Sequence, residues 1–194
     1  MPRQPDPDLE DRILKAAGTL WQKGGEKALT MRAVARSAGT NTPAVYRRFR
    51  NRKDILRTLL LRIREEVIGV LQASATPQEA CDLYLDYALS HAHEYELFYQ
   101  REYELLSGPR AVPGRGPVRP GVEVMRKKLA DTLGGTPADH ADLSLSLWMV
   151  AHGAAMLMIG KTIPPENVAA ARSVFATTVE TLLRAASRRR GSAG

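Results

Sequence analysis

Cysteine is almost absent from the sequence, and this absence removes two classes of structure. The 194 residues include one cysteine, Cys81, so no disulfide can form within the chain and no cysteine-rich metal site can be built. The histidines His91, His93, His140 and His152 do not replace it. His91 and His93 are two residues apart on an expected helix and therefore face different sides. The sequence predicts no metal site and no cofactor.

Signals for secretion, membrane insertion and catalysis are missing as well. The first residues contain no apolar segment of the kind found in a secretory signal. The most apolar stretch, residues 143–159, is interrupted by serine, histidine and glycine, and we expect it to be too short and too polar to span a membrane. No glycine-rich phosphate loop and no G-x-S-x-G turn occur. We therefore expect a soluble, cytoplasmic protein that is not an enzyme.

Alternation of apolar and polar residues, which is typical of β-strands, is absent. Apolar residues instead recur at helical spacing along nearly the whole chain, and hydrophobic residues make up 44% of it. The sequence therefore predicts an all-α protein with a sizeable core. Outside residues 24–53, the expected helices cover about residues 8–23, 54–71, 78–93, 94–106, 122–133, 138–160 and 165–187. Residues 107–121 are rich in proline and glycine and are expected to form a loop.

The positive charge is concentrated in the first third of the chain. The formal net charge is +7. Residues 1–70 contain 15 Lys or Arg against 8 Asp or Glu, whereas residues 71–194 contain 13 of each. The whole excess thus lies in one segment, which indicates a head that binds a polyanion, attached to a neutral body.

Residues 30–53 contain seven Lys or Arg and no acidic residue, and their spacing is typical of a helix-turn-helix. Thr30 is a candidate N-cap for the first helix, and residues 42–48 are expected to form the second. The small Ala35 lets the two helices approach closely, and Gly39 can adopt a left-handed conformation in the turn. Such a unit places its second helix in the major groove of DNA.

Several segments in the first third of the chain resemble the TetR family of bacterial transcription regulators. The matching segments are Arg12-Ile13-Leu14-x-Ala16-Ala17, Leu29-Thr30-Met31-Arg32-x-Val34-Ala35, Ala38-Gly39 and Pro43-Ala44-Val45-Tyr46-x-x-Phe49-x-Asn51-Arg52-Lys53-Asp54-Ile55-Leu56. Trp148-Met149-Val150-Ala151-His152-Gly153 is similar to the Trp-x-x-x-His-Gly signature in the regulatory half of some members.

This resemblance implies nine or ten helices: a helix-turn-helix head, a linking helix, and a helical bundle for ligand binding and dimerisation. On this basis we expect a three-helix DNA-binding domain over residues 1–53, a linking helix over 54–73, a ligand-binding and dimerisation domain over 74–187, and a disordered basic tail over 188–194. The implied partners are a double-stranded DNA operator, a small-molecule effector and a second copy of the chain.

Chemistry and position select the candidate DNA contacts. Arg32 can reach a guanine edge, Asn41 can pair with adenine, and Thr42 or Ala44 can meet a thymine methyl. Tyr46 and the arginines beside it suit phosphates, as does Lys53. The full predicted set is Thr30, Arg32, Thr40, Asn41, Thr42, Ala44, Tyr46, Arg47, Arg48 and Lys53. Solvated charged residues are the alternative for the arginines.

Two further sets are predicted in the body. Aromatic and methionine side chains that could line a ligand pocket are Tyr84, Tyr87, His91, Tyr95, Phe98, Tyr99, Met125, Trp148, Met149 and His152, although for any one of them a place in the core is the better explanation. Apolar residues of the last two helices that could face a second subunit are Leu143, Leu147, Val150, Ala154, Leu157, Val174, Phe175, Thr178 and Leu182.

Together with these residues, the resemblance to the TetR family implies a homodimeric repressor that a small molecule releases from a palindromic operator. Two alternatives stay open. One is a basic nucleic-acid-binding module without sequence preference or effector. The other is a small-molecule-binding protein or enzyme with an incidental basic head.

Overall fold

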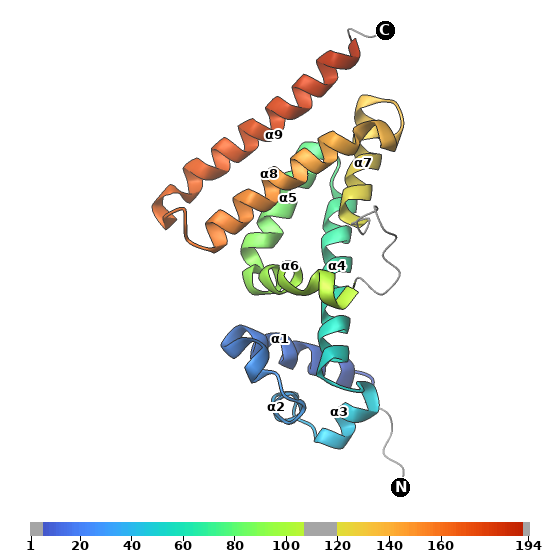
Figure 1. The fold of residues 1–194 in the computed structure, drawn as a ribbon, viewed down its shortest axis with the longest axis vertical. Coiled ribbons are helices and arrows are strands. Elements are labelled where there is room, and N and C mark those ends of the chain that lie inside the picture. The colour runs from blue at the N-terminus through green and yellow to red at the C-terminus, as the bar shows by residue number, and fades with distance from the viewer. Residues whose placement is uncertain (1–5, 107–119, 192–194) are drawn as a thin grey trace. The chain divides into compact units, whose positions relative to one another are not determined.

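The computed structural model describes residues 6–106 and 120–191, and all regular structure in these ranges is helical (Figure 1). The α-helices are α1 (Leu9–Ala28), α2 (Met31–Ser37), α3 (Thr42–Arg48), α4 (Arg52–Ala73), α5 (Pro77–Ser90), α6 (Ala92–Leu106), α7 (Pro120–Leu133), α8 (Ala141–Ile159) and α9 (Val168–Gly191), with 3₁₀ turns η1 (Pro137–His140) before α8 and η2 (Pro165–Asn167) before α9. The prediction of an all-α fold with a helix-turn-helix head is confirmed.

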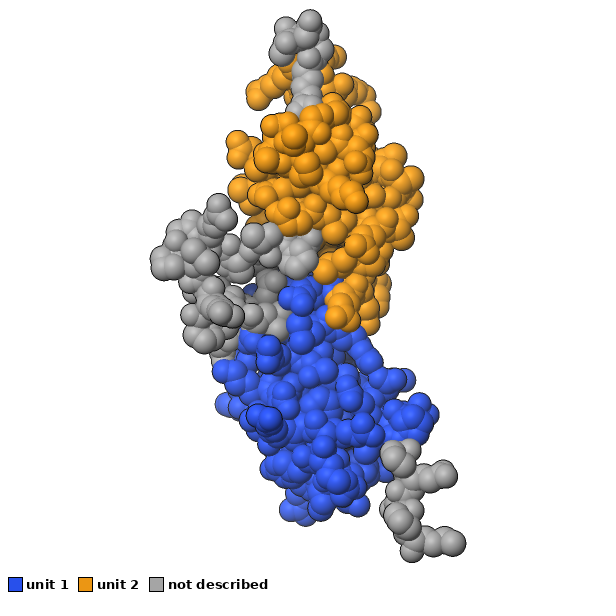
Figure 2. Space-filling view, turned by 90° about the vertical axis from the view of Figure 1, so that its right-hand side faces the viewer, with its two compact units in different colours: residues 1–64, 93–110 blue, residues 65–92, 111–194 orange. Residues whose placement is uncertain are grey.

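The chain forms two compact units, and neither unit is continuous in sequence (Figure 2). One unit contains residues 1–64 and 93–110, and the other contains residues 65–92 and 111–194. This grouping follows contacts rather than chain order, and it differs from the expected division at residues 53 and 73.

The first unit has a single apolar core that the three head helices share with α4 and α6. From the head it contains Ile13, Leu14, Val34, Ala35, Val45 and Phe49, and from α4 it contains Ile55, Leu56, Leu60 and Ile63. Leu97, Phe98 and Leu105 of α6 belong to the same cluster. Burial of this apolar surface is the main force that holds the head together.

Helix α1 is broken near its end, as the two adjacent glycines predict. Gly24 and Gly25 have non-helical backbone angles, and Gly25 has a φ of 59°, which favours glycine. One further turn follows the break, so the helix ends at Ala28 rather than at the glycines. This turn contains Glu26, whose carboxylate accepts from Arg52 of α4 at 2.6 Å and pairs with Arg101 of α6 at 3.1 Å.

Cap residues stabilise the starts of α4 and α5. Thr76 Oγ1 accepts from the Glu79 amide at 3.1 Å, and the Glu79 carboxylate accepts from the Ala75 amide at 2.6 Å. At the start of α4, Asn51 Oδ1 accepts from the Asp54 amide at 3.0 Å. The bonds accepted by Thr76 and Asn51 satisfy amides that the first helical turn leaves unpaired.

The second unit packs α5, α7, α8 and α9 together with the last part of α4. Helix α5 contacts α7, α8 and α9, and α8 lies beside α9 (Figure 1). Arg172 of α9 pairs with Asp86 of α5, and Lys128 Nζ of α7 donates to the Ser74 carbonyl at 2.5 Å.

Two sequence expectations about segment ends need correction. Helix α7 begins at Pro120, where proline suits the first turn, so residues 120–121 are helical rather than part of a loop. The rest of that expected loop, residues 107–119, lies outside the described residues. Helix α9 continues through residues 188–191, because alanine and arginine are good helix formers and no breaker precedes Gly191. The remainder of the expected tail, residues 192–194, is also outside the described residues.

The apolar stretch of residues 143–159 lies within α8, which begins two residues before it. With its 3₁₀ turn, the segment Pro137–Ile159 has 23 residues, and an 18-residue window in it has a mean hydropathy of 1.4, so the segment is long and apolar enough to cross a membrane by length and composition alone. By these two criteria the expectation that this stretch is too short and too polar to span a membrane is wrong, because α8 alone has 19 residues. Only 28% of its most apolar window is buried within the chain.

Candidate nucleic-acid interface

The turn between α2 and α3 has the geometry that a glycine-capped helix end requires. Gly39 has a φ of 66°, its amide donates to the Arg36 carbonyl at 3.3 Å, and the Thr40 amide donates to the Ala35 carbonyl at 2.9 Å. These two bonds form a Schellman motif, which satisfies the last carbonyls of α2. The motif fixes where α3 begins relative to α2.

Side chains at the two helix starts are engaged in capping. Thr30 Oγ1 accepts from the Ala33 amide at 3.1 Å, and Asn41 Oδ1 accepts from the Ala44 amide at 2.9 Å. Asn41 would need the same oxygen to pair in two-point fashion with adenine. Its evident role in this structure is to start α3.

Helix α3 buries one face and exposes the other. Val45 and Phe49 lie in the core, whereas Tyr46 is 54% exposed and Arg47 and Arg48 are exposed beside it. Ala44 is only 4% exposed, because it packs on the face that α3 turns toward α2, so the predicted contact of Ala44 with a thymine methyl is not available. Arg32 and Lys53 are exposed, and Thr40 and Thr42 are partly exposed.

One arginine of the basic cluster is committed to the protein itself. Arg52 bonds both the carboxylate and the backbone carbonyl of Glu26, the latter at 3.2 Å. It therefore joins α4 to α1 and is not a free charge for DNA. Arg50 and Lys53, its neighbours, remain exposed.

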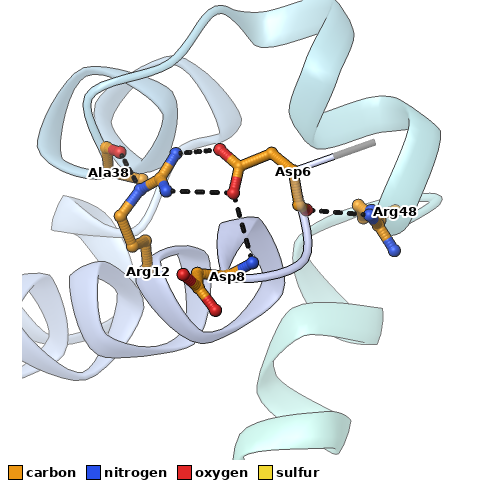
Figure 3. A network of polar contacts seen from close by, with 5 residues as sticks. All are labelled: Asp6, Asp8, Arg12, Ala38 and Arg48. Atoms are coloured by element: carbon orange, nitrogen blue, oxygen red, sulfur yellow. Dashed lines mark hydrogen bonds and ion pairs between the residues drawn. The ribbon is translucent and has the colours of Figure 1, made fainter. Parts of the chain in front are cut away.

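A polar network at the start of the chain joins all three head helices (Figure 3). The Asp6 carboxylate accepts from Arg12 of α1 at 2.8 and 3.3 Å, and Arg12 Nε also donates to the Ala38 carbonyl at the end of α2 at 3.3 Å. The Asp6 carbonyl accepts from Arg48 of α3 at 3.2 Å. The hydrogen bonds from Arg12 lower the pKa of the Asp6 carboxyl and Asp6 raises the pKa of Arg12, so both groups stay charged near neutral pH.

Sequence reasoning missed this network. Prolines flank Asp6, and the first expected helix begins only at about residue 8. Asp8 does occupy the N-cap position of α1, but its side chain makes no capping bond, and its amide instead donates to the Asp6 carboxylate at 3.1 Å. The spacing of Asp6 and Arg12 carries no helical signal, because Asp6 precedes the helix.

The predicted pocket residues fall into two groups. Tyr95, Phe98 and Tyr99 lie on α6 in the first unit, where Phe98 belongs to the core and packs edge-on to Tyr99 at 5.3 Å. The second unit contains the rest, namely Tyr84, Tyr87, His91, Met125, Trp148, Met149 and His152. Met149 is 59% exposed, so its side chain faces away from the interior of the unit.

In the second unit, two aromatic stacks involve histidine. Tyr87 stacks on His91 with ring centres 4.4 Å apart, and Trp148 stacks on His152 at 5.5 Å. The Tyr87 hydroxyl donates to Glu66 at 3.0 Å. Among the described residues no group of three or more metal-ligating side chains occurs.

The residues predicted for a subunit interface are divided between surface and core. Leu157 and Val174 are exposed, and Leu143, Val150, Ala154, Thr178 and Leu182 are partly exposed. Leu147 and Phe175 are buried inside their own unit, where α8 and α9 pack against α5 and against each other, and they are not available to a partner. The exposed apolar side chains of α8 also include Leu145, Met149 and Met156.

Comparison with known proteins identifies two matching family models. One, described as bacterial regulatory proteins of the tetR family, matches residues 13–59. The other, described as a tetracyclin repressor-like C-terminal domain, matches residues 78–182. No protein of curated function matches the sequence significantly.

Solved structures agree at the level of the fold. The structure of SCO4313, a protein provisionally named as regulatory, superposes on this chain with a TM-score of 0.72, and the two sequences are 20% identical. The match covers 91% of this chain and 95% of that chain. The transcriptional regulator SCO7222, a TetR from Streptomyces coelicolor, is 17% identical with a TM-score of 0.64 over 92% and 97%. A variant of TetR from Acinetobacter baumannii AYE in complex with minocycline is 17% identical with a TM-score of 0.62 over 96% and 99%.

Proposed function

Because the chain belongs to the tetR family of bacterial regulatory proteins, we propose that it is a homodimeric, cytoplasmic repressor that a small molecule releases from a palindromic operator. The family consists of DNA-binding transcription regulators and not of enzymes. The observation that carries the proposal is the division of α3 into a buried apolar face and an exposed face formed by Tyr46, Arg47 and Arg48.

The proposed functional domains are those expected from the sequence. Residues 1–53 would bind DNA, residues 54–73 would link, and residues 74–187 would bind the effector and the second subunit. Base reading would fall to Arg32, Thr40 and Thr42. Thr30, Tyr46, Arg47, Arg48 and Lys53 would contact phosphates, and Asn41 would hold the start of α3.

The DNA-binding proposal is tested by selecting duplexes from a random library with the full-length protein. Fluorescence anisotropy then compares the selected duplex with a scrambled one across a salt series. We expect tight binding to a palindrome with half-sites about 34 Å apart, and affinity that falls steeply as salt rises. Selection of no sequence, with equal binding to both duplexes, would instead support a nonspecific basic module.

Exposed apolar side chains on α8 and α9 support dimerisation. Met149 is 59% exposed and Val174 is 67% exposed, and only 28% of the apolar window of α8 is buried within its own chain. Large exposed apolar surface usually marks a site of contact with a partner. A second copy would present the same two helices and give a closed, two-fold assembly with two recognition helices.

The dimer is tested by sedimentation velocity of the wild type and of Met149→Glu and Val174→Glu. We expect the wild type to sediment at twice the 21.3 kDa chain mass and the variants to sediment as monomers. Glu180→Gln, at another exposed position on α9, is the matched control and should remain dimeric. A monomeric wild type at micromolar concentration would refute this part of the proposal.

The effector site is proposed in the second unit, among side chains of α5, α7 and α8. Tyr84, Tyr87 and Met125 are buried there, and Trp148 and His152 are partly buried on α8. Aromatic and methionine side chains suit a planar, largely apolar ligand with a few polar groups. Minocycline, which is bound in the structure of the TetR variant from Acinetobacter baumannii, is the first probe in a thermal-shift panel. A compound that raises the melting temperature and releases the selected duplex would support the proposal. Stabilisation without release would support binding but not induction.

A further inference from the structure

Asp6 is negatively charged, as DNA is, yet its network of hydrogen bonds reaches a side chain of the proposed DNA interface. We propose that Asp6 is a positioning residue of the DNA interface: its carboxylate fixes the start of the chain on α1, so that its backbone carbonyl holds the Arg48 side chain of α3 in place to meet a phosphate. This proposal rests on the DNA-binding function proposed above.

The Asp6 carboxylate is fully used in fixing the backbone around it. Arg12 bonds its two oxygens at 2.8 and 3.3 Å, and the Asp8 amide bonds it at 3.1 Å. Two-point pairing between arginine and a carboxylate sets orientation as well as distance. The position of the Asp6 carbonyl therefore depends on this pair.

Arg12 in turn is held to the helix-turn-helix. Its Nε donates to the carbonyl of Ala38, the residue that ends α2 and precedes Gly39 in the turn. A cation suits the carbonyl end of a helix. Through Arg12, the Asp6 backbone thus has a fixed relation to the turn that orients α3 (Figure 3).

This arrangement fixes the position of the Arg48 side chain. It lies in the last turn of α3 and is exposed, and one of its terminal nitrogens donates to the Asp6 carbonyl at 3.2 Å. Arginine has five N–H donors, so most of them remain for a phosphate. Holding a long side chain before DNA arrives reduces the conformational entropy that is lost on binding.

The proposal and simple electrostatics predict opposite results. Removal of a negative charge from a basic surface should strengthen binding to every DNA sequence, because repulsion of phosphates falls. If Asp6 instead positions Arg48, its removal should weaken binding, because Arg48 then loses its fixed orientation.

The experiment measures anisotropy of the selected operator with full-length wild type, Asp6→Ala, Asp6→Asn, Arg48→Ala and Asp6→Ala/Arg48→Ala across a salt series. We expect Asp6→Ala to lose affinity by roughly two- to tenfold, the range of a single hydrogen bond, and its salt slope to fall by about one. The double variant should bind no worse than Arg48→Ala. Asp8→Ala is the matched control, since it removes the same charge two residues away without a capping bond to lose, and should not weaken binding.

The outcomes separate this proposal from the proposed function. Binding of Asp6→Ala that equals or exceeds the wild type, or losses that add in the double variant, would overturn the role of Asp6 alone. A wild type that binds no duplex would overturn the DNA-binding function and this proposal with it. Circular dichroism and the milder Asp6→Asn change show whether any loss comes from unfolding, and a loss that appears only in unfolded protein would also overturn the positioning role.

Discussion

Replacement of glycine by alanine should have opposite effects on stability at Gly39, which lies in a left-handed turn, and at Gly69, which lies in a helix. Gly39→Ala places a side chain at a φ of 66°. A Cβ at this position would meet no atom within 4 Å, so the cost is conformational only. A left-handed conformation costs an L-residue about 1–2 kcal/mol, and we expect Gly39→Ala to lower the free energy of unfolding by that amount.

Gly69→Ala on α4 is the matched control, because that glycine is also exposed and a Cβ there would also meet no atom within 4 Å. It lies in a regular helix, where alanine is favoured over glycine by about 1 kcal/mol. We therefore expect Gly69→Ala to raise the stability. For a chain of this size, 1 kcal/mol shifts the melting temperature by about 2–4 °C.

Urea denaturation followed by far-UV circular dichroism measures both variants, and an unchanged m-value shows that only stability differs. Hydrogen exchange then locates the change. In Gly39→Ala, the amides that donate to Ala35 and Arg36 should exchange faster than in the wild type. A Gly39→Ala variant as stable as the wild type, beside a stabilised Gly69→Ala, would refute the left-handed turn and with it the described placement of α3.

Three other predictions follow from burial and charge. Val45→Ala should lower the free energy of unfolding by about 2 kcal/mol, because Val45 is fully buried. Tyr46→Ala should leave the melting temperature unchanged and weaken DNA binding, because Tyr46 is exposed. The reverse pattern would contradict the described orientation of α3. The depressed pKa of Asp6 means that its stabilising effect is present above about pH 4 and is lost as the pH falls further, so an acid titration of Asp6→Asn should show a smaller loss than the wild type over this range. Burial raises the pKa of the Cys81 thiol to about 12, so a thiol reagent at pH 8 should label it only on unfolding, and equal labelling rates in buffer and in urea would show that Cys81 is accessible.

Local signals in the sequence predict the head well. Thr30 and Asn41 are capping residue types directly before apolar positions, and Gly39 is the residue that a left-handed helix end favours, so the bounds of α3 agree with those predicted. These features depend on neighbours within six residues. Local backbone chemistry is what a single sequence encodes most directly.

Tertiary contacts explain the errors. Ala44, Leu147 and Phe175 have the residue types of their predicted sites, but the side of each helix that faces the core depends on the helices packed around it. Asp6, Arg12 and Arg48 come together from segments separated by up to 42 residues, and no spacing rule relates them. The assignment of α6 to the core of the first unit is also a contact between distant parts of the chain.

The contribution of α6 to the core of the first unit limits how freely this protein can be divided into parts. Leu97, Phe98 and Leu105 are supplied from a stretch that follows the end of the helix-turn-helix by more than 40 residues along the printed sequence. A fragment that stops at the end of α3 or within α4 would leave the apolar side chains of α1 and α4 without these partners. A chimera that takes only its N-terminal segment from a relative therefore combines the core of one parent with the α6 of the other. The two sets of side chains have not been selected to pack together. A working chimera needs α6 from the same parent as its recognition helix, or a rematched set of side chains at this junction.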